Sequence, residues 1–270
     1  MKSKALSIPY VIWMAVFVVA PLLLILAFAV TDSAGSLTLE NFSTMTDFTT
    51  VFGRSFFQAF LATVICLAIG YPLAYFLSRE SERLRKLAMM LIMLPMWMNF
   101  LLRTYAWMAL LEDNGLINQA LSFLGLPNLH IMNTGAAVVL GMVYNYLPFM
   151  ILPIFSVIDK IDHRVIEAAQ DLGANGAQVF RKVIFPLSLP GVLSGITMVF
   201  IPSVSTFALS RLLGGGKTML LGDLIEMQFL GTAYDPHLGS AIALVMMVIV
   251  LACMAVMNRF GEGEEGVAVL

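Results

Sequence analysis

The sequence predicts an all-α polytopic membrane protein with six membrane-spanning helices. Of its 270 residues, 60% are hydrophobic and only 12% are charged, and the mean hydropathy is +0.90. Soluble domains are about 25% charged and about 45–50% apolar, so this composition excludes a soluble globular protein. A helix needs about 20 apolar residues to cross the hydrocarbon core of a bilayer. Six stretches of about that length lie at 8–30, 55–77, 88–111, 134–158, 187–210 and 238–258.

The first stretch is predicted to be an uncleaved membrane helix rather than a signal peptide. Its apolar run is longer than that of a signal peptide, it contains Pro21, and no small-residue cleavage site follows it. The chain is accordingly divided into three parts. These are an N-terminal helix with an outer loop over residues 1–50, a membrane core over residues 51–258, and a tail over residues 259–270.

The distribution of basic residues predicts the orientation, because cytoplasmic segments carry an excess of Lys and Arg. With the N-terminus inside, only Arg54, Arg211 and Lys217 lie outside. Arg103 falls within a span, and the other eleven basic residues lie inside. Both termini are therefore expected in the cytoplasm, together with the polar segment that covers residues 159–190.

The outer segments are predicted to carry a net negative charge. A negative vestibule would concentrate cations and repel anions. Sorting of basic residues to the inside would leave the same pattern without any function, so both interpretations stay open. The acidic residues that face outward in this orientation are Asp32, Glu40, Asp47, Glu112, Asp113, Asp223, Glu226 and Asp235.

The polar segment is predicted to contain an amphipathic helix, a tight bend and a second helix. Asp162 is a suitable N-cap, Gly173 would end the helix, and Asn175-Gly176 would form the bend. An alternative is an interfacial helix that only anchors the loop in the lipid surface. Such helices are usually rich in Lys and Arg on the polar face, whereas the acidic residues here favour a protein partner. The first helix would have an apolar face formed by Val165, Ile166, Ala169 and Leu172.

The polar segment also contains a spaced motif. Glu167-Ala168-Ala169 is followed after three residues by Gly173, then after nine residues by Val183, and after one more residue by Phe185-Pro186. This motif resembles the signature loop of the inner-membrane subunits of binding-protein-dependent ABC importers. The usual form in that family is E-A-A, three residues, G, nine residues, I, one residue, L-P. Val183 and Phe185 replace the usual Ile and Leu, and the resemblance implies the type I ABC importer permease fold.

In that family the loop forms a coupling helix that docks on a separate ATPase subunit. The resemblance implies that residues 159–186, called the polar loop below, do so here. ATP and Mg²⁺ would then bind the ATPase, and this chain would hold no cofactor. The residues that the resemblance implies in ATPase coupling are Glu167, Ala168, Ala169, Asp171, Gly173, Phe185 and Pro186.

Longer segments extend the resemblance over most of the chain. Residues 67–77, 94–121, 144–162 and 212–229 are similar to the spermidine/putrescine importer permeases, and among these to the first of the two permease subunits. The similarity implies a non-enzymatic transport subunit in the inner membrane of a bacterium, with polyamine as substrate. The implied partners are a second homologous permease, an ATPase dimer and an extracytoplasmic polyamine-binding protein, with no nucleic acid.

A polyamine path needs groups that replace the water around each ammonium, such as carboxylates, carbonyls and aromatic faces. Asn99, Arg103 and Trp107 lie at i, i+4 and i+8 of the third predicted span, which predicts one polar stripe. Asp223 and Glu226 are expected in a re-entrant or outer loop, where they would guide a cation. The candidate pathway residues are Trp97, Asn99, Tyr105, Trp107, Tyr144, Asn145, Asp223 and Glu226. The two tryptophans fit a packing or interfacial role equally well.

Arg103 is interpreted separately, because a cation is not an obvious ligand for a cationic substrate. An arginine within a membrane span is rare and usually faces the bundle interior or water. We expect a structural ion pair between Arg103 and one of the acids Glu112, Asp113 and Asp223. The alternative is that its side chain extends to the outer surface.

Two motifs that suggest enzymes are rejected. Gly214-Gly215-Gly216-Lys217-Thr218 resembles the end of a phosphate-binding loop, but Arg211 occupies the position of the required first glycine. Ser194-Gly195 in the fifth span is typical of a membrane serine protease, yet all three histidines lie outside the predicted spans.

The predicted function is therefore the membrane permease of an ATP-driven polyamine importer that works by alternating access. One alternative is the same importer class with an amino acid or an anion such as sulfate as its substrate. A stand-alone secondary transporter or channel would not need the polar loop, and an intramembrane hydrolase is disfavoured by the positions of the histidines.

Overall fold

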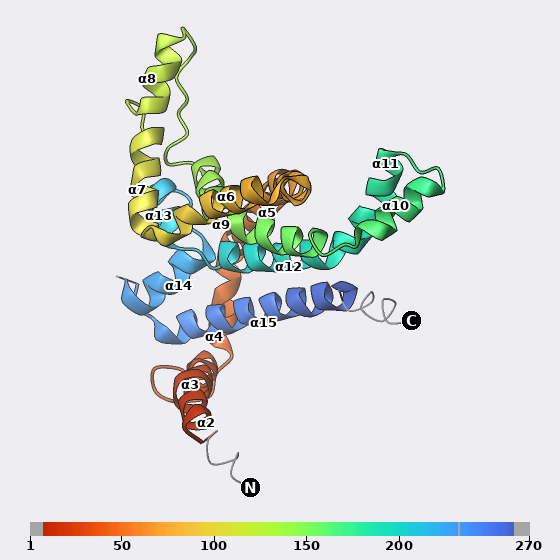
Figure 1. Cartoon of the computed structure of the whole chain (residues 1–270). Helices are drawn as coiled ribbons and strands as arrows, with labels where there is room; N and C mark the ends of the chain where they lie inside the picture. The colour runs from red at the N-terminus through yellow and green to blue at the C-terminus, as the bar shows by residue number, and fades with distance from the viewer. Residues whose placement is uncertain (1–7, 232, 262–270) are drawn as a thin grey trace.

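The computed structural model describes residues 8–231 and 233–261 of the chain (Figure 1). Their regular structure is helical, apart from one isolated bridge between Thr31 and Leu37. The helices are, in chain order, α2 (Ile8–Met14), η1 (Ala15–Val19), α3 (Ala20–Ala29), α4 (Glu40–Thr44), η2 (Met45–Phe48), α5 (Thr49–Arg79), α6 (Glu82–Met93), η3 (Leu94–Trp97), α7 (Phe100–Leu111), α8 (Leu116–Phe123), α9 (Gly135–Ile158), α10 (His163–Asp171), α11 (Gly176–Val179), η4 (Phe180–Ile184), α12 (Phe185–Val204), α13 (Ala208–Leu213), α14 (Leu221–Leu230) and α15 (Pro236–Gly261).

Five helical stretches of the described chain are long and apolar enough to cross a membrane. A sixth span is present if a bent pair of stretches, Glu82–Trp97 and Phe100–Phe123, counts as one. The predicted all-α membrane fold is therefore confirmed. The five stretches are Ile8–Ala29, Glu40–Arg79, Gly135–Ile158, Gly176–Val204 and Pro236–Met257.

The third predicted span is not one straight helix, and the expectation of a continuous helix over 88–111 was wrong. After η3 the chain turns by 95° into α7. Met98 and Asn99 have non-helical backbones at this turn, with ψ of 149° and 131°. The side chain of Asn99 accepts a hydrogen bond from the backbone N–H of Leu101 at 2.8 Å, as an N-cap does. A new helix therefore begins at Phe100 and takes a new direction.

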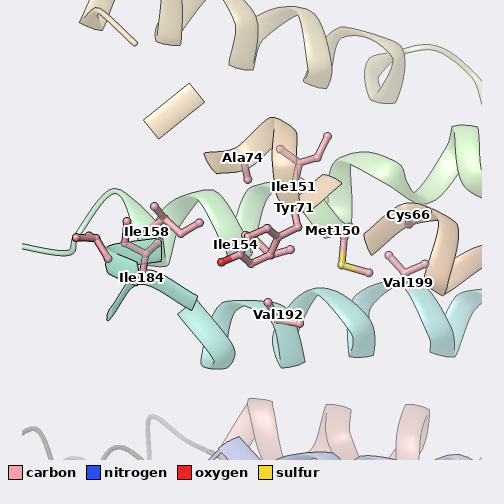
Figure 2. Packing of buried hydrophobic residues seen from close by; sticks show 11 residues of the cluster. Cys66, Tyr71, Ala74, Met150, Ile151, Ile154, Ile158, Ile184, Val192 and Val199 are labelled. Atoms are coloured by element: carbon pink, nitrogen blue, oxygen red, sulfur yellow. The ribbon is translucent and has the colours of Figure 1, made fainter. Parts of the chain in front are cut away.

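The centre of the fold is formed by α5, α9 and α12, which pack against one another. Figure 2 shows buried side chains from all three helices in one cluster, among them Tyr71 of α5, Ile154 of α9 and Val192 of α12. The backbones of α9 and α12 come close at Gly191, where a Cβ would lie 2.8 Å from the carbonyl oxygen of Pro153. Small residues allow such close approach between membrane helices.

The N-terminal span lies outside this centre. α2, η1 and α3 form one continuous helical stretch, and α3 packs on α15. In α2, η1 and α3 only Ala29 is buried, because the rest of this span has no neighbours on most of its surface. Its division from the core at residue 50 stays a prediction, as does the tail over 259–270, of which residues 262–270 lie outside the described chain.

Several of the short helices lie at the two ends of the long ones. In Figure 1, α10 and α11 lie at one end of α9 and α12, whereas α8, α13 and α14 lie toward the other. The polar loop thus stands at the opposite end from the segments that were predicted to face outward. This separation agrees with the predicted orientation, which itself stays a prediction.

Candidate functional site

The polar loop is a compact unit in which both ends of α10 and the start of α11 are capped. The carboxylate of Asp162 accepts a hydrogen bond from the backbone N–H of Arg164 at 3.0 Å and caps α10, as the sequence predicted. At the other end, the N–H of Gly173 donates to the carbonyl of Gln170 at 2.8 Å, and that of Ala174 donates to Ala169 at 3.0 Å. These two bonds form a Schellman motif around a left-handed residue.

Gly173 is that left-handed residue, with φ of +84°. A Cβ at this position would meet nothing within 4 Å, so the requirement for glycine comes from the backbone conformation and not from crowding. Two residues later, Asn175 and Gln178 form a reciprocal capping box, with both N–H to side-chain oxygen distances at 2.9 Å. The predicted helix, bend and second helix are therefore confirmed.

The side chains of α10 divide into a packed face and an exposed face. Ile166 and Ala169 pack against the central cluster of α5, α9 and α12. Glu167, Ala168 and Asp171 are exposed. The prediction that Leu172 lies on the packed face was wrong, because this residue caps the helix at the bend and is 90% exposed. Val165 is also half-exposed. The motif thus presents charged, small and apolar side chains together.

An open cavity of about 650 Å³ lies between α10 and the adjoining ends of α5 and α6. Glu167 and Gln170 line it from α10, and Arg79 and Arg85 line it from α5 and α6. Glu167 forms no ion pair within the described residues. The remaining motif residues begin α12, where Phe185 is 43% exposed and Pro186 occupies the first turn, a position that suits proline.

The predicted polar stripe of the third span does not form. The side chain of Asn99 is exposed and caps α7 by accepting from the backbone N–H of Leu101, whereas Arg103 is buried, so the two side chains do not form one stripe. Trp97 is 79% exposed on η3, and Tyr105 is 52% exposed on α7. These residues therefore do not converge on one site within this chain.

The predicted ion pair of Arg103 is also wrong. Arg103 is 9% exposed, its Nε has no hydrogen-bond partner, and no carboxylate of the described chain lies within 4 Å of it. Asp113 instead contacts His130 at 2.8 Å. Glu112 follows α7 and stands nine residues from Arg103, which is about 13 Å along a helix. The break at Asn99 places Arg103 in the first turn of α7, away from these acids.

Two of the predicted pathway residues do meet. The rings of Trp107 and Tyr144 lie 5.2 Å apart at 68°, an edge-to-face packing contact. Asn145 is buried, and its amide donates to the carbonyl of Gly141 at 2.8 Å.

Sequence reasoning missed an apolar cavity of about 640 Å³ between α9 and α12, which is lined by Tyr146, Phe149, Leu152, Pro153, Met198 and Pro202. The prolines within both helices were its only sequence signal.

Asp223 and Glu226 lie on α14, a short helix rather than the loop that was expected. Asp223 is 6% exposed and accepts a hydrogen bond from the N–H of Leu220 at 3.0 Å. Burial raises the pKa of this carboxyl above its usual value. Glu226 forms an ion pair with Arg211 at 2.7 Å. Guidance of a cation by these two residues stays a prediction, and neither offers an exposed free charge to support it.

The glycine cluster that resembles a phosphate loop is a packed turn. Gly215 and Gly216 have φ of +57° and +73°. A Cβ on Gly215 would lie 1.9 Å from the Oδ1 atom of Asn133, whose own N–H donates to the carbonyl of Leu213. The side chain of Asn133 fills the space against this turn.

Comparison with known proteins decides the family. The family of the binding-protein-dependent transport system inner membrane component matches residues 68–262. The chain belongs to this family. Over 257 residues it is 38% identical to the spermidine/putrescine transport system permease protein PotB of Haemophilus influenzae, covering 92% of this chain and 90% of the relative. It is 36% identical over 247 residues to PotB of Escherichia coli K12, covering 88% and 90%.

Solved structures support the fold of this importer permease. A bacterial ABC transporter involved in the import of the acidic polysaccharide alginate matches with a TM-score of 0.83 at 17% identity, over 97% of this chain and 95% of that one. The MetNI methionine ABC transporter matches with a TM-score of 0.61 at 18% identity, over 82% and 97%. The permease therefore has the predicted type I importer fold, and it is the membrane subunit of an ABC importer.

Proposed function

We propose that this permease imports polyamines and is driven by an ATPase that docks on the polar loop. The observation that carries the proposal is the shape of α10. The helix packs on the membrane core through Ile166 and Ala169, and it ends in a left-handed glycine. It leaves Glu167, Ala168 and Leu172 exposed. A surface of small, apolar and charged side chains at the end of a helical bundle suits a protein partner better than a lipid surface.

The proposed assembly contains four kinds of subunit. A second homologous permease completes the membrane path, and a dimer of ATPases binds ATP and Mg²⁺ on the side of α10. A polyamine-binding protein delivers the substrate at the opposite end. Both termini of this chain then lie in the cytoplasm of a bacterium, because α10 faces the ATPase. The chain itself supplies a gated path rather than a nucleotide or metal site.

Polyamine as the substrate is supported by the relatives, which are named as spermidine/putrescine permeases and match about nine tenths of the chain. The chain offers chemistry that suits such a molecule. The cavity between α9 and α12 is apolar and aromatic, with Tyr146 and Phe149 in its wall. It would accept the methylene segments of a polyamine, while aromatic faces stabilise each ammonium group by about 0.5–2 kcal/mol.

Reconstitution of the full importer in proteoliposomes tests this proposal. Spermidine or putrescine, together with the binding protein, should stimulate ATP hydrolysis and should accumulate inside the vesicles in an ATP-dependent manner. Amino acids and sulfate serve as the comparison. If one of these stimulated hydrolysis and neither polyamine did, the polyamine assignment would be wrong while the importer assignment would stand.

A further inference from the structure

Two tyrosines of α5 hold the segment that leads out of the polar loop. Tyr71 and Tyr75 are four residues apart on α5 and therefore lie on one face of it. The ring of Phe180 lies 5.9 Å from that of Tyr71 and 5.1 Å from that of Tyr75, at interplanar angles of 87° and 78°. Edge-to-face contacts of this kind are the preferred arrangement of aromatic rings. Phe180 is thus held in a notch between the two tyrosine rings.

Tyr71 also reaches the first turn of α12. Its hydroxyl forms a hydrogen bond with the hydroxyl of Ser188 at 2.8 Å, and its ring lies 5.9 Å from that of Phe185. Tyr71 is only 9% exposed, and Figure 2 shows it among the cluster side chains of α9 and α12. Tyr75 in turn carries the guanidinium of Arg79 at 4.5 Å from its ring centroid. One end of α5 is therefore fastened to both η4 and α12.

The backbone on both sides of this contact is irregular. Phe180 is the first residue of η4, a π-helical turn between α11 and α12. Turns of this type occur frequently at functional sites. Pro72 lies inside α5 between the two tyrosines, and its ring nitrogen cannot donate to the carbonyl of Ala68. The last turns of α5 are thus separated from the rest of the helix by a missing hydrogen bond.

We propose that Tyr71 and Tyr75 are positioning residues that carry a displacement of the polar loop into α5. The proposal rests on the proposed docking of this loop to an ATPase. When α10 is displaced, Phe180 moves with it, and the two tyrosine rings draw the end of α5 along because packed side chains transmit displacement. The missing hydrogen bond at Pro72 lets this end bend, and the bond from Tyr71 to Ser188 makes α12 follow.

The test compares transport with ATP hydrolysis in the full importer. Tyr75→Leu should lower the number of spermidine molecules imported per ATP hydrolysed by about tenfold, which corresponds to about 1.4 kcal/mol. The rate of ATP hydrolysis should change by less than about twofold, because docking is untouched. Tyr75→Phe keeps the aromatic ring and should retain the parent's number of spermidine molecules imported per ATP hydrolysed. Phe60→Leu is the matched control, since this ring lies on the same helix and is 60% exposed.

A second measurement needs ATP but no substrate. Spin labels on Ser81, beyond the end of α5, and on Arg164 of α10 report the distance between the two elements, after replacement of Cys66 and Cys253 by alanine. In the parent protein ATP should leave this distance unchanged, because both elements move together. In Tyr75→Leu the distance should change on ATP binding.

The results separate the two proposals. If Tyr75→Leu left the import per ATP unchanged, or lowered import and hydrolysis in equal proportion, the positioning role would be overturned. An unchanged label distance in Tyr75→Leu would overturn it as well. Failure of the proposed docking would give a different result. If the ATPase did not dock on the polar loop, a Gly173 variant that disturbs the bend would still retain the ATPase on purification.

Discussion

The guanidinium of Arg85 lies 2.6 Å from the carboxylate of Asp159 and ties the start of α6 to the turn that follows α9. The two side chains are 30% and 34% exposed, so the pair is partly shielded from solvent. It joins two membrane helices at the base of the polar loop. The loop is thereby anchored on one side by charge and on the other by the aromatic contacts of Phe180.

A double-mutant cycle on Arg85→Ala and Asp159→Ala should give a coupling free energy of about 0.5–1 kcal/mol, the upper range for surface pairs. Thermal unfolding of the purified protein at low and high salt measures it, and salt should reduce it. The pair of Lys86 and Glu82 is the control, since its side chains are 75% and 67% exposed. A coupling no larger than that of the control would contradict this prediction.

Gly173→Ala should weaken binding of the ATPase and lower ATP-driven uptake, because a left-handed backbone costs an L-residue about 1–2 kcal/mol. Gly176→Ala is the matched control, since a Cβ there also meets open space but the backbone is not left-handed. Gly173→Asn should retain more activity than Gly173→Ala, because asparagine tolerates this conformation. Retention of the ATPase on affinity purification and uptake into vesicles measure the effect. Equal behaviour of the two alanine variants would argue against the assigned role of the bend.

Gly191→Ala should destabilise the membrane core more than Gly195→Ala does. A Cβ on Gly191 would lie 2.8 Å from the carbonyl oxygen of Pro153, which is backbone and cannot move aside. A Cβ on Gly195 would lie 2.7 Å from the sulfur of Met150, the flexible end of a side chain. Overpacking of this kind costs about 1–3 kcal/mol. The midpoint of thermal unfolding, compared between the two variants, checks the order, and the reverse order would refute the packing argument.

Asp223 should make the protein more stable as the pH falls. Burial raises the pKa of its carboxyl in the folded state, Glu226 adds to this rise, and Arg211 opposes it. A folded-state pKa above the unfolded value of about 3.9 means that the folded protein binds the proton more tightly. The unfolding free energy therefore rises as the pH falls through the raised folded pKa toward about 3.9, and the gain is lost as the pH rises again.

Asp223→Asn removes this titration and should keep the hydrogen bond from the N–H of Leu220. Its unfolding midpoint should exceed that of the parent at neutral pH, and the difference should shrink as the pH is lowered. Glu226→Gln, which breaks an ion pair with Arg211, is the contrasting variant and should destabilise. A constant difference between parent and Asp223→Asn at every pH would show that the carboxyl does not titrate in this range.

The membrane fold and the polar loop could be predicted from the sequence because their determinants are local. A helix that crosses the bilayer needs a long apolar run, and such runs can be recognised in the sequence without knowledge of tertiary contacts. The caps at Asp162, Gly173 and Asn175 are likewise set by residues within a few positions. The break before α7 has a local signal too, since Asn99 is a good N-cap, but the apolar residues on both sides of Asn99 predict one continuous helix.

The pathway residues could not be predicted, since their surroundings depend on contacts between distant segments. Arg103 was assigned a carboxylate by charge alone, yet the direction of α7 after its break decides which acids it can reach. The burial of Asp223 and the pairing of Glu226 with Arg211 depend on how α13 and α14 fold together. The cavity at Tyr146 arises from the packing of α9 on α12, of which the sequence gives only the prolines.

The capped ends of α10 have a consequence for molecular recognition. The hydrogen bonds that cap the helices and form the bend between Asp162 and Gln178 are all made between residues of the loop itself. The free loop is therefore preorganised, and association loses little conformational entropy on this side of the contact. In the proposed docking, partner choice would depend on a few exposed side chains, such as Glu167 and Leu172, because the hydrogen bonds that set the shape of the loop do not involve these side chains.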